Sequence, residues 1–223
     1  PCGPDTEMFY DRGAGIGCGR SECAPGCSCE RFLEFWNLVF MEFELHPDGT
    51  LTPLPAQNVD TGLGIERTAS ILQGVTSVYE TDGYQAIMEW IAGQGGVAYG
   101  ESERATKAHR ILADHGRGMT FLTADGVIPS NEGRGYILRR IIRRAVQQAR
   151  AIDLASLWPL TDVVIEQMAE WYPELSEHRQ QVQEIVRGEE ERFSETLERG
   201  LKVFEELAGG EAISGADAFT LAA

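Results

Sequence analysis

The sequence predicts an α+β chain, with antiparallel strands up to about residue 81 and helices after it. The segment 31–45, RFLEFWNLVFMEFEL, is rich in aromatic and branched residues in partial alternation between turn-rich flanks, which favours a strand over a helix. From about residue 103 the apolar residues recur at spacings of three and four, the period of a helix. With 223 residues, 43% of them hydrophobic, the chain suits one large or two modest globular domains. We therefore expect two parts, residues 1–81 and 82–223.

The first part is expected to hold a small sheet. Residues 1–11, PCGPDTEMFYD, predict a turn that enters a short strand, and residues 12–30 form a loop by their Gly, Ser and Cys content. After the strand 31–45, HPDGT is typical of a hairpin turn, and residues 51–59, LTPLPAQNV, predict another strand. Beyond Gly64 the apolar spacing becomes helical.

The second part is expected to be all helical. VIPSNEGRG, residues 127–135, contains a Pro and two Gly and predicts a loop. The segment 177–206 is acidic and is expected to present a solvated face, and Gly209-Gly210 should end its helix. Helices are expected over 103–126, 136–150, about 160–171 and 177–208.

Charge is unevenly distributed along the chain. The formal net charge of −16 has the wrong sign for a protein that binds nucleic acid indiscriminately. Residues 133–150 nevertheless contain six arginines and no acid, and four of these arginines repeat at i, i+4 beside an apolar stripe. An acidic protein with one arginine stripe fits a local anionic partner.

The ends and the apolar runs of the chain bear on its compartment. No apolar run approaches the roughly 20 residues that span a bilayer, so we expect a soluble, cytoplasmic protein without a membrane partner. The opening PCGPDTE has neither a basic nor an apolar leader segment. A first residue other than Met suggests a fragment of a longer chain.

The segment 58–74, NVDTGLGIERTASILQG, places an acid, two glycines and an arginine at the start of an apolar helix. Gly62 and Gly64 let the backbone come close to a ligand, because no Cβ blocks the approach. Arg67 offers a planar fork for phosphate oxygens, and Asp60 offers a carboxylate for an ammonium group. The pattern describes a pocket for a ligand with an amine and a phosphate. The alternative is an ordinary strand-to-helix turn capped by Asp60.

Four of the five cysteines fall within twelve residues: Cys18, Cys23, Cys27 and Cys29. Such a group can hold one zinc ion tetrahedrally through thiolates, although the CxC step is tighter than the usual spacing. The alternative is a loop of free thiols in a reducing compartment. Nothing indicates an oxidising compartment, so a disulfide framework is the weaker explanation. We favour a structural zinc site.

GLGIER followed by a helix resembles motif 3 of class II aminoacyl-tRNA synthetases, and the whole chain is similar to the alanyl-tRNA synthetase family. The resemblance covers most of residues 1–150 in family order and spacing. It implies the C-terminal portion of a class II antiparallel catalytic sheet, with motif 3, for 1–81, and a helical tRNA acceptor-stem recognition domain for 82–223. The matching stretches are PCGPDTEMFYD, FLEFWNLVFMEF, LTPLPAQNVDTGLGIERTASILQG, YETD, ILADHGRGMTFLTADGVIPSNEGRGYILRRIIRRA and ISGADAFTL.

The resemblance implies an alanine–tRNA ligase, which activates L-alanine with ATP and Mg²⁺ to alanyl-adenylate and transfers the alanyl group to the 3′ end of tRNA-Ala. By this resemblance Asp60 binds the alanine ammonium group, Val39 lines the side-chain pocket and Gly62 forms its floor. Gly64 and Arg67 contact ATP, and Asp60 and Arg67 are the residues expected to serve catalysis. Motifs 1 and 2 and the editing domain are not in this sequence, so the chain alone is expected to be inactive.

The resemblance also implies that residues 129–145 face the acceptor stem of tRNA-Ala and its G–U wobble pair. Asn131 is the expected base-reading side chain, because an amide can donate and accept hydrogen bonds at once. For Arg139 and Arg143, salt bridges to the acidic helices are at least as good an explanation as RNA contact. The family pattern continues after FTL with a Tyr-Asp pair that is missing here. The alternative function is a non-catalytic acceptor-stem binding module. Phosphate contacts are expected from Arg134, Arg140 and Arg144.

Overall fold

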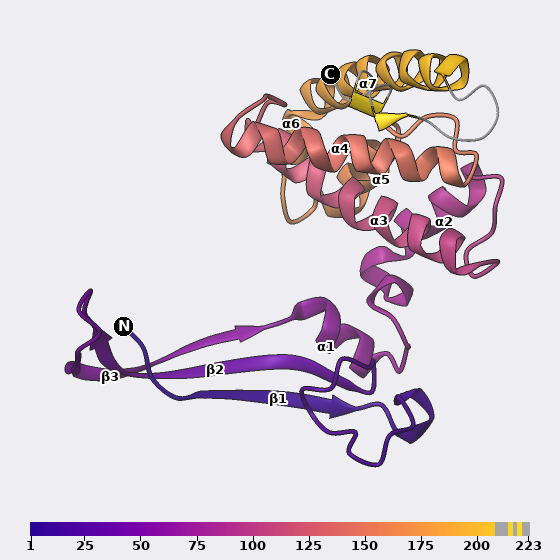
Figure 1. Ribbon diagram of the computed structural model, residues 1–223. Coiled ribbons are helices and arrows are strands. Elements are labelled where there is room, and N and C mark those ends of the chain that lie inside the picture. Colours follow the sequence, from indigo (N-terminus) through magenta and orange to yellow (C-terminus); the bar gives the residue numbers. More distant parts are fainter. Residues whose placement is uncertain (208–213, 216–217, 220–223) are drawn as a thin grey trace. The chain divides into compact units, whose positions relative to one another are not determined.

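In the computed structural model, a sheet comes first in the chain and helices follow it (Figure 1). The structure describes residues 1–207, 214–215 and 218–219. The helix end predicted at Gly209-Gly210 and most of the segment 213–221 lie outside the described residues. Contacts divide the chain into two units, Pro1–Tyr84 and Gln85–Ala223, and we describe each unit by itself. The predicted α+β class is confirmed.

The sheet of the first unit consists of β1 (Asp5–Asp11), β2 (Phe32–Leu45) and β3 (Leu51–Leu63), antiparallel and in this order. The predicted hairpin turn joins β2 to β3, where His46 N donates to Thr50 O at 2.9 Å. β3 continues four residues past the expected strand end at Val59, because Asp60 and Gly62 still pair with β2. The acid and the first glycine of the 58–74 motif therefore lie in a strand and not in a turn.

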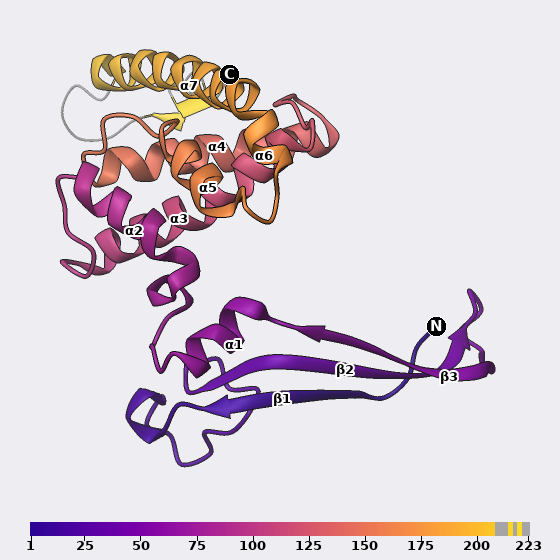
Figure 2. The same ribbon diagram turned by 180° about the vertical axis from the view of Figure 1, so that it is seen from behind.

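A short helix, α1 (Ile65–Leu72), follows β3 directly and packs against β2 (Figure 2). Gly64 is its N-cap residue and donates its backbone N–H to Phe35 O at 3.0 Å, which ties the helix entry to β2. Two 3-10 turns, η1 (Ala14–Ile16) and η2 (Val78–Glu80), complete the described elements of this unit.

Side-chain burial differs sharply between the two units. Tyr84 is the first buried apolar residue along the described chain, and large apolar side chains of the sheet such as Phe40, Leu45 and Val59 are exposed. The residues on the faces of the sheet are therefore accessible to ligands and to further protein segments.

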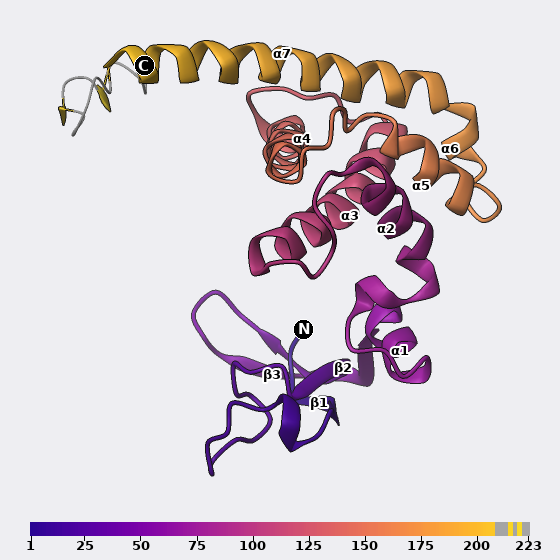
Figure 3. The same ribbon diagram turned by 90° about the vertical axis from the view of Figure 1, so that its right-hand side faces the viewer.

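The second unit is a helical bundle in which α3, α4 and α7 contact one another (Figure 3). Its core contains Leu112 and Met119 of α3, Leu138 and Ile142 of α4, and Leu160, all fully buried. Within the described chain, every helix is too short or too polar to cross a membrane. The helices are α2 (Asp82–Gln94), whose first three residues belong to the first unit, α3 (Glu103–Ala124), α4 (Gly133–Ala151), α5 (Leu160–Met168), α6 (Glu174–Glu177) and α7 (Arg179–Leu207).

Two helices begin at other residues than the sequence predicted, and α5 ends at Met168, three residues before its predicted end at residue 171. α4 begins at Gly133, three residues before the predicted start, so the last part of VIPSNEGRG is helical. The helix predicted over 177–208 begins later, at Arg179, because the short α6 ends at Glu177 and His178 is its C-cap residue. The close contact between α3 and α5 depends on a glycine. A Cβ at Gly116 of α3 would lie 2.5 Å from Leu160 Cδ2 of α5, so the two helices can approach this closely only because Gly116 has no side chain.

Candidate functional site

One face of the sheet collects the residues predicted to bind an amino acid. Val39 of β2 lies opposite Asp60 of β3, and Asn37 lies opposite Gly62. Facing residues of an antiparallel pair point to the same side of the sheet, so these four share one face. A Cβ built at Gly62 would meet no heavy atom within 4 Å, and Asp60 is exposed. The face therefore offers a carboxylate, an apolar side chain and open space beside the bare backbone.

A second carboxylate on this face was not predicted from the sequence. Asp5 of β1 lies opposite Val39, so Val39 is flanked by acids on both neighbouring strands. Asn37 Nδ2 donates to Asp5 Oδ1 at 2.8 Å, which fixes the Asp5 carboxylate. The two acids make this face attractive to a cation such as an ammonium group. Only the strand pairing identifies Asp5, because its partners are far away along the chain.

Arg67 is fixed at the start of α1 by β2. Its Nη1 donates to Glu34 O at 2.7 Å, and the Glu34 carboxylate lies 3.9 Å from the same nitrogen. The Arg67 side chain remains 50% exposed. A guanidinium has five N–H donors, so Nε and Nη2 stay available for an anion. The guanidinium is therefore fixed and still accessible, which is compatible with the phosphate contact that the sequence analysis expects of Arg67.

The loop before α4 holds Asn131 through a chain of polar contacts. Asn131 Oδ1 accepts a hydrogen bond from Arg139 Nη1, and Arg139 Nη2 also donates to Pro129 O at 3.2 Å. Arg139 Nε in turn lies 3.4 Å from Glu189 Oε1 of α7. An amide oxygen has two lone pairs, so Asn131 keeps one acceptor site and its NH₂ group for a ligand. Arg139 therefore orients Asn131 and leaves most of its hydrogen-bonding capacity open.

Gly135 has no side chain, and this lets the loop fold tightly onto α4. A Cβ at Gly135 would lie 2.3 Å from both Ile128 O and Ser130 Oγ. Only glycine fits such an approach, and it brings the loop against the first turn of the helix. Ser130 Oγ adds a hydrogen bond to Glu132 O at 2.8 Å. The position of Asn131 is thus set by Gly135 on one side and Arg139 on the other.

Glu189 is the centre of the buried charge network. Its side chain is fully buried, with Arg143 Nε at 2.8 Å and Arg192 Nη2 at 3.2 Å in addition to Arg139. For Arg139 and Arg143, the structure shows the salt bridges that the sequence analysis gave as the alternative to RNA contact. The expected solvated face of the acidic segment is wrong at this position, because α7 turns Glu189 toward the arginines of α4.

Glu190, the next residue, is also buried and not solvated. Its two carboxylate oxygens accept hydrogen bonds from the backbone N–H groups of Leu157, at 2.7 Å, and Trp158, at 2.9 Å. Burial raises the pKa of Glu190 above its usual range, against the lowering effect of these two hydrogen bonds. Glu190 therefore anchors the segment between α4 and α5 to α7.

Three further arginines of α4 are exposed, and Arg150 in its last turn lies 3.7 Å from Glu198 of α7. Tyr136 and Ile137, which are 46% and 47% exposed, lie on the same part of the helix. Among the described residues, none of the predicted phosphate-contacting arginines has an ion-pair partner within 4 Å. These three exposed arginines are Arg134, Arg140 and Arg144. Together these residues form an exposed basic and aromatic surface next to Asn131, which we call the α4 surface.

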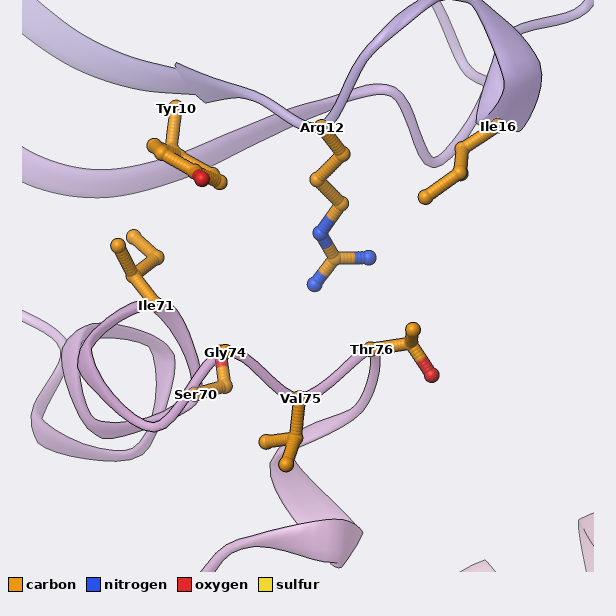
Figure 4. Close-up of a pocket in the computed structure, with 8 residues that line it drawn as sticks. All are labelled: Tyr10, Arg12, Ile16, Ser70, Ile71, Gly74, Val75 and Thr76. Atoms are coloured by element: carbon orange, nitrogen blue, oxygen red, sulfur yellow. The ribbon is translucent and has the colours of Figure 1, made fainter.

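A pocket of about 170 Å³ lies between the end of β1 and the residues that follow α1 (Figure 4). Figure 4 shows the Arg12 side chain extending toward Gly74 and Thr76. The carbonyl groups at the C-terminal end of α1 favour a cation there. Arg12 lines the pocket and donates from Nη1 to Glu30 O at 3.5 Å, and we interpret the pocket as part of the packing of α1 and not as a ligand site.

The four clustered cysteines are brought together by the loop between β1 and β2. Their Sγ atoms all lie within 4.8 Å of one another, and all four are free thiols. Arg20, which the sequence analysis did not single out, donates from Nε to Cys18 Sγ at 3.3 Å and from Nη2 to Cys27 Sγ at 3.2 Å. The side-chain hydrogen bond from Arg20 to Cys18, and after it the backbone N–H of Arg20, lower the pKa of Cys18 from 9.0 to about 6.

An ion pair closes the same loop at its base. Arg31 Nε and Nη2 donate to the two carboxylate oxygens of Asp11, each at 2.7 Å, and Gly13 N donates to Oδ1 at 2.8 Å. Arg31 first, and Gly13 second, lower the pKa of Asp11 from 3.8 to about 2.

The ion pair should stabilise the fold in a defined pH window. Because the pKa of Asp11 is lower in the folded state, its stabilising effect is complete above about pH 4 and is lost as the pH falls toward 2. An NMR titration of the side-chain carboxyl carbons should show a midpoint near 2 that disappears in Asp11→Asn. A midpoint near 3.8 for Asp11 would show that the ion pair does not form in solution.

Comparison with known proteins agrees with this arrangement. The model of the family "tRNA synthetases class II (A)" matches residues 1–223, the entire chain. The chain is 46% identical over 229 aligned positions to an alanine–tRNA ligase of Pelotomaculum thermopropionicum, with 99% of this chain and 26% of that protein covered. It is 47% identical to an alanine–tRNA ligase of Desulforudis audaxviator (93% and 24% covered), and 45% identical to one of Desulfosudis oleivorans (96% and 25%).

The chain thus spans about a quarter of the length of the curated relatives that it matches. Residues 58–74 resemble motif 3 of class II synthetases, and the class II family model matches the rest of the sequence as well. The antiparallel sheet followed by helices is the architecture that this resemblance implied. Since the family model matches from the first residue to the last, the chain belongs to the class II (A) tRNA synthetases.

Proposed function

We propose that this chain is the part of an alanine–tRNA ligase that binds alanine and ATP on the first unit and the acceptor stem of tRNA-Ala on the second. One observation carries the proposal: Val39, Asp60 and Gly62 share one sheet face in a chain that is similar over its whole length to alanine–tRNA ligases. The proposal assigns amino-acid activation to residues 1–81 and acceptor-stem recognition to residues 82–223, the division that the sequence analysis expects. Both activities belong to protein synthesis in the cytoplasm.

The sheet face fits the chemistry of alanine. Asp60 would accept a charge-assisted hydrogen bond from the ammonium group of alanine. Val39, which lies opposite Asp60 on β2, would contact the methyl group of alanine. Asp5 would add a second negative charge close to the ammonium group. Gly62 leaves room for the amino acid beside the backbone. A site of this kind excludes large amino acids sterically and discriminates less well against glycine and serine.

The start of α1 fits a nucleotide. Class II synthetases use ATP and Mg²⁺, and Arg67 would direct its free Nε and Nη2 groups at the phosphates while Gly64 admits them close to the backbone. When the alanine carboxylate attacks the α-phosphate, negative charge grows on the phosphate oxygens, and a fixed guanidinium stabilises it. Mg²⁺ would arrive with ATP, because it is held mainly by phosphate oxygens and water.

Amino-acid-dependent exchange of pyrophosphate into ATP tests this part of the proposal. The assay should use the full-length protein that contains this chain, with alanine, glycine, serine and valine compared at equal concentration. Alanine should support the fastest exchange, glycine and serine slower exchange, and valine none. Fast exchange with another amino acid and none with alanine would overturn the proposed substrate.

The α4 surface fits an acceptor stem. The wide, shallow minor groove of an RNA helix exposes base edges and 2′-hydroxyl groups, so a side chain on a loop can reach a G–U pair there. Asn131 would do so with its free NH₂ group and second lone pair. The exposed arginines of α4 would contact phosphates on either side.

Arg140→Ala and Arg144→Ala should each weaken binding of an acceptor-stem minihelix and make it less salt-dependent. Each lost phosphate contact should lower the slope of log K against log [salt] by roughly 0.7 to 0.9. The loss should be equal for G–U and G–C minihelices, because phosphates carry no base identity. Titrations at several salt concentrations measure this slope. Arg104→Ala, an exposed arginine at the start of α3, is the control and should leave it unchanged.

A second candidate function is acceptor-stem binding without catalysis. The buried apolar core of the described chain begins at Tyr84, so the helical unit carries its own core while the sheet does not. If this chain binds the minihelix but catalyses no alanine-dependent exchange, the chain is a binding module and catalysis needs the rest of the protein.

A further inference from the structure

The connection between β1 and β2, residues 12–31, has little regular structure. Its one described element is the three-residue η1, and none of its side chains is fully buried. A connection of this length needs another source of order to hold one conformation. We propose that Cys18, Cys23, Cys27 and Cys29 bind one Zn²⁺ as a structural site, with Arg20 as its outer hydrogen-bonding and charge partner.

The positions of the sulfur atoms match a zinc tetrahedron. Cys18 Sγ lies 3.7 Å from Cys27 Sγ, and Cys23 Sγ lies 3.6 Å from Cys29 Sγ. Four sulfurs at a Zn–S distance of about 2.3 Å are separated by about 3.8 Å along each edge of a tetrahedron. Two opposite edges therefore already have the required length, and the other pairs lie within 4.8 Å.

The same distances argue against other uses of the cysteines. A disulfide joins two sulfurs at about 2.05 Å, well short of the separations here. An iron–sulfur cluster would need space for several iron and sulfide atoms between the ligands, whereas sulfurs within 4.8 Å of one another enclose room for a single ion.

Arg20 supplies the charge that a four-thiolate site needs. Zn²⁺ binds all four sulfurs as thiolates, and the S–H protons that they still carry pass to solvent, with no oxidation or reduction. Four thiolates and Zn²⁺ carry a net charge of −2, and Arg20 lowers it to −1. Its two N–H···S hydrogen bonds bridge Cys18 and Cys27, one of the two short edges of the tetrahedron. Outer-shell groups of this kind orient the ligands and tune the metal.

The backbone of the loop is already shaped for the site. Cys23 N donates to Arg20 O at 3.2 Å, and Cys27 N donates to Ala24 O at 3.0 Å, so two of the cysteines end tight turns. Gly26, which precedes Cys27, has a φ of 88°, which favours glycine.

The zinc site would also support the proposed amino-acid site through strand register. The cluster ends at Cys29, and directly after it Asp11 pairs with Phe32 at the first rung of the β1–β2 ladder. Asp5 opposite Val39 belongs to the same ladder, beyond a register shift between Met8 and Phe9, so holding this end of the ladder supports the pairing of the two strands without setting that rung alone. The inference itself stands on the cysteine geometry and does not depend on the proposed enzyme activity.

Metal content is the first test. The chain, purified under reducing conditions with zinc in the medium and passed through a desalting column, should contain about one zinc per chain by mass spectrometry of elements. The double variant Cys18→Ser/Cys27→Ser should lose it, while Cys2→Ser, a matched substitution outside the cluster, should keep it. Zinc absent from the unsubstituted chain, or retained by the double variant, would overturn the proposal.

Cobalt is the second test, and it separates the ligand set from folding. Co²⁺ added to the zinc-free chain should give the intense visible bands of a tetrahedral thiolate site and the near-ultraviolet sulfur-to-metal band. Arg20→Ala should keep this spectrum but weaken metal affinity by about 10- to 100-fold. Arg104→Ala should change neither. Weak bands typical of octahedral cobalt would overturn the four-thiolate site, and an unchanged affinity in Arg20→Ala would overturn the role of Arg20.

Discussion

Glu189→Ala should lower the free energy of unfolding of the helical unit by about 3 kcal/mol, because it leaves arginines without their buried counter-charge. Glu189 is fully buried, Arg143 Nε of α4 donates to its Oε1 at 2.8 Å, and Arg139 Nε lies 3.4 Å from the same oxygen. Removing one partner of a buried ion pair lowers the stability more than replacing both partners by apolar residues, because it leaves the other charge buried and unpaired. The variant should also weaken acceptor-stem binding, since Arg139 loses the contact that holds it in line with Asn131.

Urea denaturation followed by helical circular dichroism measures this loss. Glu191→Ala is the matched control, because Glu191 pairs at the surface with Arg187 and should contribute well under about 1 kcal/mol. Glu189→Gln should fall between the two, since it keeps the shape and a hydrogen-bond acceptor but removes the charge. Equal midpoints for Glu189→Ala and Glu191→Ala would show that the buried network does not stabilise the unit.

Asp60→Asn should reduce kcat/KM for alanine in pyrophosphate exchange by roughly 100-fold in the full-length protein, the value of a lost hydrogen bond to a charged group. Asparagine keeps the shape of the side chain and removes the negative charge that faces the ammonium group. The KM for alanine should rise, whereas the KM for ATP should change little, because Arg67 is held separately by Glu34.

The control for this variant is Asp125→Asn, an exposed acid at the C-terminal end of α3. It should leave both KM values unchanged. In Asp5→Asn we expect a smaller decrease of kcat/KM for alanine than in Asp60→Asn, because the Asp5 carboxylate already accepts a hydrogen bond from Asn37. Unchanged alanine kinetics in Asp60→Asn would contradict the assignment of the amino-acid site to this sheet face.

Local sequence patterns were sufficient to predict much of the fold. The aromatic alternation of residues 31–45 predicted β2, and the helical spacing from residue 103 predicted α3, which begins where expected. The cysteine spacing predicted a cluster whose four sulfurs the structure brings together. These features are set by neighbours in the sequence, so a local pattern carries the information.

Features that depend on distant pairing could not be predicted in the same way. β3 extends through Asp60 and Gly62 because β2 offers hydrogen-bonding partners there, although the glycines suggested a turn. Glu189 looked like one acid among many on a solvated helix, and only the packing of α7 against α4 shows that it is buried. Arg20 lay within the cysteine segment, but its role depends on where the loop folds its guanidinium.

Binding of this chain to acceptor-stem minihelices, one with the G–U pair and one with G–C at the same position, tests the central claim most directly. We predict tighter binding of the G–U minihelix at both low and moderate salt, and loss of this preference in Asn131→Ala. Equal and steeply salt-dependent binding of the two RNAs would contradict the account, because the α4 surface would then contact phosphates without reading a base.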